Sequence, residues 1–221
     1  MAMARRAVGV ALGLTLAVLG TFPEVRAQNT DPYTAEYCEP DAQTKLLYSN
    51  RAYLILPKAP DTPALYFTYQ ILETGKFVQR RGQFLFDDGD DRWEIESNPE
   101  SLRLFWPLRP EKKIEIDRVD RTNGAHAHVS FVVLGLEPIV VGGVPYKSWK
   151  IRRLDELEGG KSFVQFLWYA PALCTLSAFT DSQHRMVRLL RILKPGEQDY
   201  DRQVVVKKHH LYFADNGEMV K

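Results

Sequence analysis

The sequence lacks the local signatures of the common enzyme and cofactor classes. It contains no G-x-S-x-G nucleophile elbow, no phosphate-binding P-loop, no dinucleotide fingerprint, no H-E-x-x-H and no C-x-x-C. Each of these motifs holds a nucleophile, a phosphate or a metal through local geometry, so their absence removes the simplest routes to catalysis. Active sites assembled across a fold stay open. We expect a non-enzymatic protein that uses no cofactor.

The chain also lacks an apolar run long enough for a comfortable membrane span. The run from Ala7 to Phe22 has 16 residues, whereas a spanning helix needs about 20. It follows Arg5 and Arg6 and precedes Val25-Arg26-Ala27. This three-part layout predicts a signal peptide over residues 1–27, with an uncleaved anchor as the alternative. The mature protein is then expected in the periplasm and not as an integral membrane protein.

An excess of charge of one sign is missing as well. The formal net charge is +1, and the predicted signal peptide holds three arginines and one glutamate, so the mature chain would carry −1. Such a balance gives no bulk attraction to nucleic acid or to an anionic membrane. Nucleic acid is therefore not an expected partner.

Cysteine is scarce, with only Cys38 and Cys174 in the chain. An even number of cysteines in an exported protein usually pairs, which predicts a disulfide. The two lie 136 positions apart, and a loop of that length would contribute about 4–5 kcal/mol in the chain-entropy account. Two buried free thiols are the alternative. No histidine motif accompanies either cysteine, which disfavours a catalytic thiol.

Short apolar runs with period two fill most of the chain, and helical stripes are rare. This alternation predicts strands with one buried face. The runs are centred on Phe84–Phe86, Trp93–Ile95, Ile114–Ile116 and Val129–Val133. Turn dipeptides lie between or beside them, at Asp88-Gly89, Asn123-Gly124, Gly142-Gly143 and Gly159-Gly160. Only Gln183 to Leu193 could be either helix or strand. The spacing predicts an all-β antiparallel domain over residues 45–221, preceded by an extended arm over residues 28–44.

Four carboxylates, Asp87, Asp88, Asp90 and Asp91, cluster between two strand candidates. They surround an Asp-Gly dipeptide, which is typical of a tight hairpin. A calcium loop is the alternative. Gln83 and Leu85 stand where an EF-hand loop would need acidic ligands, so the hairpin is favoured.

Two histidines, His126 and His128, would point to one face of a strand, a spacing that metal sites use. A third ligand at a recognisable spacing is missing, so polar surface histidines are favoured and we predict no metal site. His209-His210 follow two lysines and read as part of a charged edge strand. Asp181 and Ser182 are close to His184 in sequence, which carries little weight because triads assemble across a fold.

Two aromatic segments, Phe105–Leu108 and Phe163–Pro171, are apolar at successive positions. Strands buried on both sides, or lining a cavity on one side, have this composition. An ordinary thick core is the alternative. The candidates for a ligand lining are Trp106, Trp149, Phe166 and Trp168.

Four stretches carry a resemblance: LRLFWPLRPEKK, IVVGGVPYKSWKI, FLWYAPAL and MVRLLRIL, in that order. Together they span about Leu102 to Leu193. They resemble motifs of exported proteobacterial proteins of unknown function. Those proteins are similar in turn to the incomplete β-barrels of periplasmic lipoprotein carriers, whose curved antiparallel sheets hold acyl chains on the concave face. Pro110-Glu111, Val144-Pro145-Tyr146 and Cys174 depart from the pattern. The motifs carry no assigned catalytic residues, so the resemblance implies an architecture and no activity.

Three functions remain open from the sequence. The first is a carrier that binds an apolar or amphipathic envelope component, such as a lipid or the acyl chain of a lipoprotein. The second is an accessory module of an envelope complex, which would dock through the arm or extend a partner's sheet with Gln203–Phe213. The third is a metal-dependent hydrolase built on His126 and His128.

Overall fold

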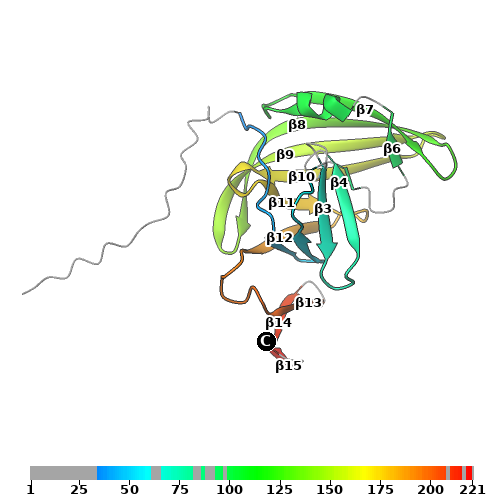
Figure 1. Cartoon of the computed structure of the whole chain (residues 1–221). Coiled ribbons are helices and arrows are strands. Elements are labelled where there is room, and N and C mark those ends of the chain that lie inside the picture. Colours follow the sequence, from blue (N-terminus) through cyan, green and yellow to red (C-terminus); the bar gives the residue numbers. More distant parts are fainter. Residues whose placement is uncertain are drawn as a thin grey trace, which may run out of the picture.

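The computed structural model describes residues 34–60, 66–81, 86–87, 93–96, 99–207, 210–215 and 218–220. The predicted signal peptide, the Asp88-Gly89 turn and the carboxylates of Asp90 and Asp91 lie outside these residues. The part of the chain that is described forms strands and two short 3-10 helices (Figure 1). No helix within it is long and apolar enough to cross a membrane.

Twelve strands form one antiparallel sheet in the order β5-β4-β3-β2-β1-β12-β11-β10-β9-β8-β7-β6. Their bounds are β1 Lys45–Tyr48, β2 Ala52–Ile55, β3 Tyr66–Ile71, β4 Phe77–Arg81, β5 Phe86–Asp87, β6 Trp93–Ile95, β7 Lys113–Asp120, β8 His126–Val141, β9 Val144–Leu157, β10 Ser162–Ala170, β11 Thr175–Thr180 and β12 Met186–Leu193. The 3-10 helices are η1 Pro99–Phe105 and η2 Pro171–Leu173. The prediction of an all-β antiparallel architecture is confirmed.

The two edges of this sheet, β5 and β6, are neighbours in sequence. Six peptide steps separate Asp87 from Trp93, so the edges lie at most about 23 Å apart at about 3.8 Å per step. A sheet of twelve strands can bring its edges this close only by bending back on itself. Figure 1 shows this curvature. The structure therefore confirms a curved, open sheet of the incomplete-barrel kind.

The core lies on the inner face of the sheet. Along β10, Leu167 and Tyr169 point into the main hydrophobic cluster, and Tyr169 is in register with Trp149 of β9. Paired residues share a face, so Trp149 is also internal and only 2% exposed. The helix η1 adds Leu102 and Phe105 to the same cluster. The alternation noted in the sequence thus fixes which side of each strand is buried.

For individual segments, three predicted turns are confirmed and one predicted strand is wrong. The turns at Asn123-Gly124, Gly142-Gly143 and Gly159-Gly160 are confirmed as the links of β7 to β10. The ambiguous segment Gln183–Leu193 contains strand β12. The expectation of a strand over Phe105–Leu108 was wrong, because that stretch ends η1 and continues through a cis Trp106–Pro107 bond. Proline has no amide hydrogen for a strand ladder.

A second, smaller sheet follows the main one. It comprises β13 (Gln203–Lys207), β14 (His210–Asp215) and β15 (Glu218–Val220), in that order. Val204 of β13 packs with Leu47 and Leu193 in a separate apolar cluster. The segment Gln203–Phe213, which the sequence offered as a partner-binding edge, contains β13 and part of β14, and these two strands pair with each other.

Candidate functional site

A cavity of about 380 Å³ opens at one end of the core. Five parts of the chain form its walls: the N-terminal arm (residues 34–44), β1, the β8–β9 hairpin around its turn, η2 with the residue after it, and the end of β12 with the residues that follow. We call this space the end cavity. Its walls come from segments more than 100 residues apart in sequence, so it exists only in the folded chain.

The inner part of the end cavity is apolar. Leu46 of β1 and Ile192 of β12 are paired in register and form one wall. Val141 and Tyr146, from the two sides of the β8–β9 hairpin, and Leu173 of η2 form the others. Leu46 and Val141 also belong to the main core cluster. The cavity is therefore a continuation of the core that is left unfilled.

One buried polar group lines this apolar space. Thr44, at the end of the arm, is 4% exposed, and its Oγ1 has no hydrogen-bond partner among the described residues. Leaving a buried hydroxyl unsatisfied costs about 1–3 kcal/mol. A buried hydroxyl without a protein partner calls for a partner from outside the chain.

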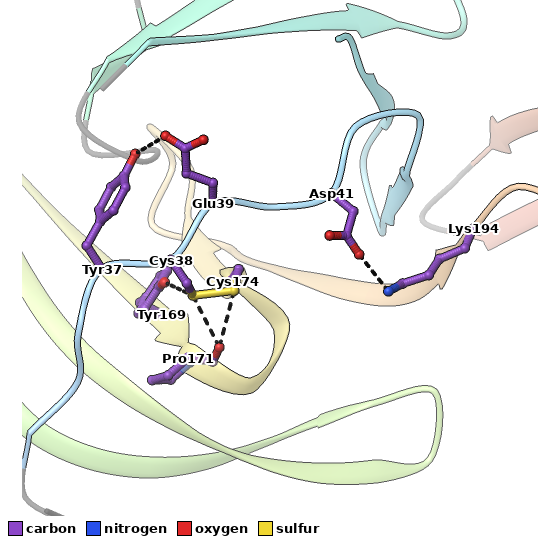
Figure 2. The surroundings of a disulfide bond; sticks show 8 residues. All are labelled: Tyr37, Cys38, Glu39, Asp41, Tyr169, Pro171, Cys174 and Lys194. Atoms are coloured by element: carbon purple, nitrogen blue, oxygen red, sulfur yellow. Dashed lines mark hydrogen bonds and ion pairs between the residues drawn. A yellow bond between two sulfur atoms is a disulfide. The ribbon is translucent and has the colours of Figure 1, made fainter. Parts of the chain in front are cut away.

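The rim of the end cavity carries charges of both signs. Asp41 of the arm accepts a hydrogen bond from Nζ of Lys194 at 2.7 Å (Figure 2). Arg191 of β12 pairs with Asp199 at 2.8 Å. Hydrogen bonds from Arg202 and then Arg191 lower the pKa of Asp199. An apolar interior below a charged rim is an arrangement that suits an amphipathic molecule.

A disulfide fixes one wall of the cavity. Cys38 of the arm is bonded to Cys174, which itself lines the end cavity, so the predicted disulfide is confirmed (Figure 2). The hydroxyl of Tyr169 lies 3.0 Å from Sγ of Cys38 and donates to it, because a disulfide sulfur has no hydrogen. Burial raises the pKa of Tyr169, which keeps that hydroxyl protonated. The arm is further tied by paired backbone hydrogen bonds between Ala35 and Leu108.

The four aromatic candidates from the sequence do not lie together. Trp149 is part of the core, and Trp106 is half-buried with its ring 4.9 Å from that of Tyr169. Phe166 and Trp168 alternate with the internal residues of β10 and so lie on the opposite face of the sheet. The walls described for the end cavity include none of the four. Their role as a ligand lining stays a prediction.

Phe166 and Trp168, on the outer face of the sheet, both lie close to a lysine. Nζ of Lys150 lies 5.3 Å from the ring centroids of both Phe166 and Trp168, and 2.8 Å from a carboxylate oxygen of Glu137. The indole of Trp168 donates to the other oxygen of Glu137 at 2.7 Å. The two hydrogen bonds lower the pKa of Glu137. The charges of Lys150 and Glu137 are paired within this cluster, which links β8, β9 and β10 and stabilises the sheet.

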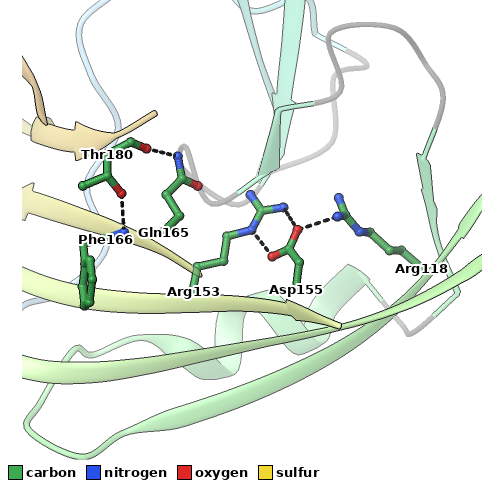
Figure 3. A network of polar contacts seen from close by, with 6 residues as sticks. All are labelled: Arg118, Arg153, Asp155, Gln165, Phe166 and Thr180. Atoms are coloured by element: carbon green, nitrogen blue, oxygen red, sulfur yellow. Dashed lines mark hydrogen bonds and ion pairs between the residues drawn. The ribbon is translucent and has the colours of Figure 1, made fainter. Parts of the chain in front are cut away.

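A buried ion network lies farther along the inner face. Arg153 contacts both carboxylate oxygens of Asp155 at 2.6 and 2.7 Å, and Arg118 contacts one of them at 2.5 Å. Figure 3 shows these side chains on one side of the sheet and Phe166 pointing to the other. Gln165 donates to the carbonyl of Thr180 at 2.7 Å. The inner face thus changes from apolar to polar along its strands.

The histidines of the H-x-H pair sit on the surface of β8. Nδ1 of His126 lies 3.0 Å from Glu96, and Nδ1 of His128 lies 2.7 Å from Asp117. The hydrogen bond to Asp117 raises the pKa of His128. Within the described ranges, no group of three or more His, Cys, Asp or Glu residues is arranged to hold a metal ion. Each histidine instead has a carboxylate of its own.

The end cavity was not foreseen from the sequence. Its residues carry no shared local pattern, and those noted in the sequence, Cys174, Gly142 and Val144-Pro145-Tyr146, had been noted for a disulfide, a turn and a departure from a motif. Thr44 and Ile192 give no signal until β1 and β12 are paired.

Comparisons with known proteins complete this description. No family model matches the chain, and no curated protein matches it. Among solved structures, the hypothetical lipoprotein YmcC from Escherichia coli (K12) is similar over 75% of this chain and 88% of that one, with 11% sequence identity and a TM-score of 0.42.

Proposed function

We propose that this protein is an exported, non-enzymatic protein that binds an apolar or amphipathic component of the cell envelope, such as an acyl chain. The end cavity carries the proposal. It joins an apolar interior, an unsatisfied hydroxyl at Thr44 and a rim of mixed charge in one space. Most ligand pockets have this composition, with few polar groups placed to orient the ligand.

The size of the cavity limits the ligand. At about 380 Å³ it falls at the lower end of the range of about 300–1,000 Å³ for ligand sites. It suits one chain of a small amphiphile better than both chains of a membrane lipid. Burial of the chain against Leu46, Val141 and Ile192 would supply about 25 cal/mol per Å² of apolar surface removed from water.

Two observations support export to the periplasm. The disulfide between Cys38 and Cys174 is a bond that persists in oxidising compartments. The first 27 residues have the layout of a signal peptide. Both fit a protein that works among envelope lipids and lipoproteins.

The test is native mass spectrometry with lipid extraction on the mature protein, purified from the periplasm without detergent. We expect a co-purified mass of single-chain lipid size. Ala172→Trp, at the exposed rim of the end cavity, should abolish it by filling the space. Ala59→Trp, an equal change at an exposed loop position that is not part of the cavity wall, should leave it unchanged. A clean apo mass that also takes up no added fatty acid would reject the proposal.

The second candidate function is an accessory interaction module. The observation that favours it is the separate sheet β13–β15, whose outer strands β13 and β15 form its edges. Truncation after Pro195 separates the two functions. A carrier should keep its ligand, whereas a module that docks through this sheet should lose its partner.

A further inference from the structure

We propose that the β8–β9 hairpin docks on the surface of a lipid bilayer and holds the mouth of the end cavity against it. The docking segment is the hairpin tip, residues 134–149. The inference goes beyond the proposed function, because a protein could bind an amphiphile without touching a membrane.

Exposed apolar side chains are concentrated on the hairpin tip. Eight large hydrophobic residues are exposed in the described part of the chain, and four of them are here. They are Leu134 (47%), Leu136 (38%), Val140 (53%) and Val144 (50%). The other four lie on four different elements. A cluster of this kind marks an interaction surface, whereas scattered residues do not.

The hairpin tip extends past the neighbouring strands. The register of β7 with β8 ends at Val132, and that of β10 with β9 ends at Trp149. Beyond these points β8 and β9 pair with each other up to the Gly142-Gly143 turn. In Figure 1 the labelled strands β8 and β9 continue into a bent ribbon at the side of the sheet. No other strand is therefore paired to the edges of the tip, although the tip packs against β11 through Ser148 and Ser177 and passes close to the carbonyl of Leu190 in β12 at Gly142.

Two prolines decide between a lipid and a protein strand as the occupant. Pro138 of β8 and Pro145 of β9 are both exposed in the ribbon. Proline lacks the amide hydrogen that an added strand would need, and natural sheets use it to block edge pairing. Binding to a bilayer through side chains requires no backbone hydrogen bonds from the tip. The composition therefore favours insertion of side chains over extension of a sheet.

The charges of the tip agree with a lipid surface. The hairpin tip, residues 134–149, contains one acidic residue, Glu137. Lys147 is exposed in this stretch, and Lys150 is paired with Glu137. An exposed lysine beside apolar side chains attracts lipid phosphates, and each such residue strengthens binding to an anionic membrane about fivefold.

The docking surface is continuous with the end cavity. Val141 and Val144 are paired and, with Gly142, form part of the cavity wall, while Val140 pairs with the exposed Pro145 on the other face of the ribbon and is 53% exposed. The tip is thus both wall and contact surface. When it rests on a bilayer, a single-chain amphiphile can pass between membrane and cavity with little exposure of its chain to water.

Co-sedimentation with vesicles tests this proposal. The mature protein is mixed with vesicles of phosphatidylethanolamine and phosphatidylglycerol, or of phosphatidylcholine alone. We expect the protein to pellet with both and more strongly with the first. Val140→Asp, at a position outside the cavity wall, should weaken partitioning about threefold or more, since burial of the exposed half of the valine side chain contributes at least about that factor. Lys147→Glu should weaken it about fivefold or more, on the anionic vesicles only.

The matched control is Phe77→Asp, an equal apolar-to-acid change at a residue that is 62% exposed on β4. It should pellet like the unchanged protein. Failure of the unchanged protein to pellet would overturn the proposal, as would equal loss in the Phe77→Asp variant. A dimer in size-exclusion chromatography that Val140→Asp dissociates would identify a second copy as the occupant and also overturn it. Native mass spectrometry with added fatty acid distinguishes this proposal from the proposed function. The Val140→Asp variant is expected to take up the fatty acid while pelleting less with vesicles. If the unchanged protein pellets but takes up no fatty acid, only the proposed function is rejected.

Discussion

Replacing Thr44 by valine should change stability and ligand binding in opposite directions. Its Oγ1 is buried without a partner among the described residues, and valine keeps the shape while removing the hydroxyl. The penalty for an unsatisfied buried hydroxyl is about 1–3 kcal/mol. Taking the low end, we expect the free energy of unfolding of the ligand-free protein to rise by about 1 kcal/mol. For a domain of this size that raises Tm by about 2–4 °C.

Ligand binding should weaken in the same variant. A hydrogen bond between the ligand and Thr44 contributes about 0.5–1.5 kcal/mol, so Kd should rise about twofold to tenfold. Urea denaturation of delipidated protein and calorimetric titration with a fatty acid measure the two effects. Thr180→Val is the matched control, because Oγ1 of Thr180 accepts a hydrogen bond from the amide of Phe166 at 2.8 Å. That variant should lose about 1–3 kcal/mol of stability. If Thr44→Val also loses stability, the hydroxyl is satisfied and the reasoning is refuted.

Three further predictions concern bonds that hold the fold. The Cys38→Ser/Cys174→Ser variant should lose about 2–4 kcal/mol in urea denaturation and should fail to retain ligand, because the arm forms a cavity wall. Asp155→Asn should lower the free energy of unfolding by about 3 kcal/mol, since it leaves the guanidinium groups around it with a weaker partner in a buried site. The contact with Asp117 raises the pKa of His128, so its stabilisation is present below about pH 6.5 and is lost as pH rises through the raised pKa. His128→Gln should flatten the pH dependence of the urea midpoint over that range.

Each of these has a control or a contrary outcome. Full ligand retention by the disulfide-free variant would show that the arm holds its place without the bond. Arg185→Gln removes the partner of Asp181 at an arginine that is 60% exposed, and it should cost less than about 1 kcal/mol. If Asp155→Asn lowers the free energy of unfolding by no more than Arg185→Gln does, the ion network around Asp155 is not desolvated. His126→Gln, at a more exposed histidine, provides the comparison for His128.

The strands were predictable because apolar and polar residues alternate along them, and this local pattern indicates which face of each strand is buried. Ile114 and Ile116, for example, face the core cluster from β7 as expected. The disulfide was predictable because two cysteines in an exported chain have few alternatives. The segment Phe105–Leu108 was not, because its composition fits either a doubly buried strand or a turn packed into the core. Only the bend at Pro107 distinguishes them.

The candidate site depended on information that no local pattern holds. The sequence pointed to tryptophans as ligand contacts, since aromatic side chains bury large surfaces. Whether Trp149 and Trp168 share a face depends on the register of β9 with β10, which is a long-range property. The end cavity depends likewise on the register of β1 with β12 and on the reach of the hairpin tip. The volume of a cavity depends on how distant segments pack together, so it cannot be predicted from the sequence of any one segment.

The strand order of the main sheet has a consequence for how the chain could be rearranged. Every pair of neighbours in that order is consecutive in sequence except β1 and β12, where Lys45 lies opposite Leu193. A circular permutant that joins the end of β12 to the start of β1, and begins at β6, would run through all twelve strands as one uninterrupted meander. Its new ends would fall at the two edges of the main sheet, where no strand pairing of that sheet would be broken. The main sheet is thus a simple meander whose first and last strands in sequence, β1 and β12, are neighbours in its middle, and the permuted sheet, with fewer distant pairings, should fold faster.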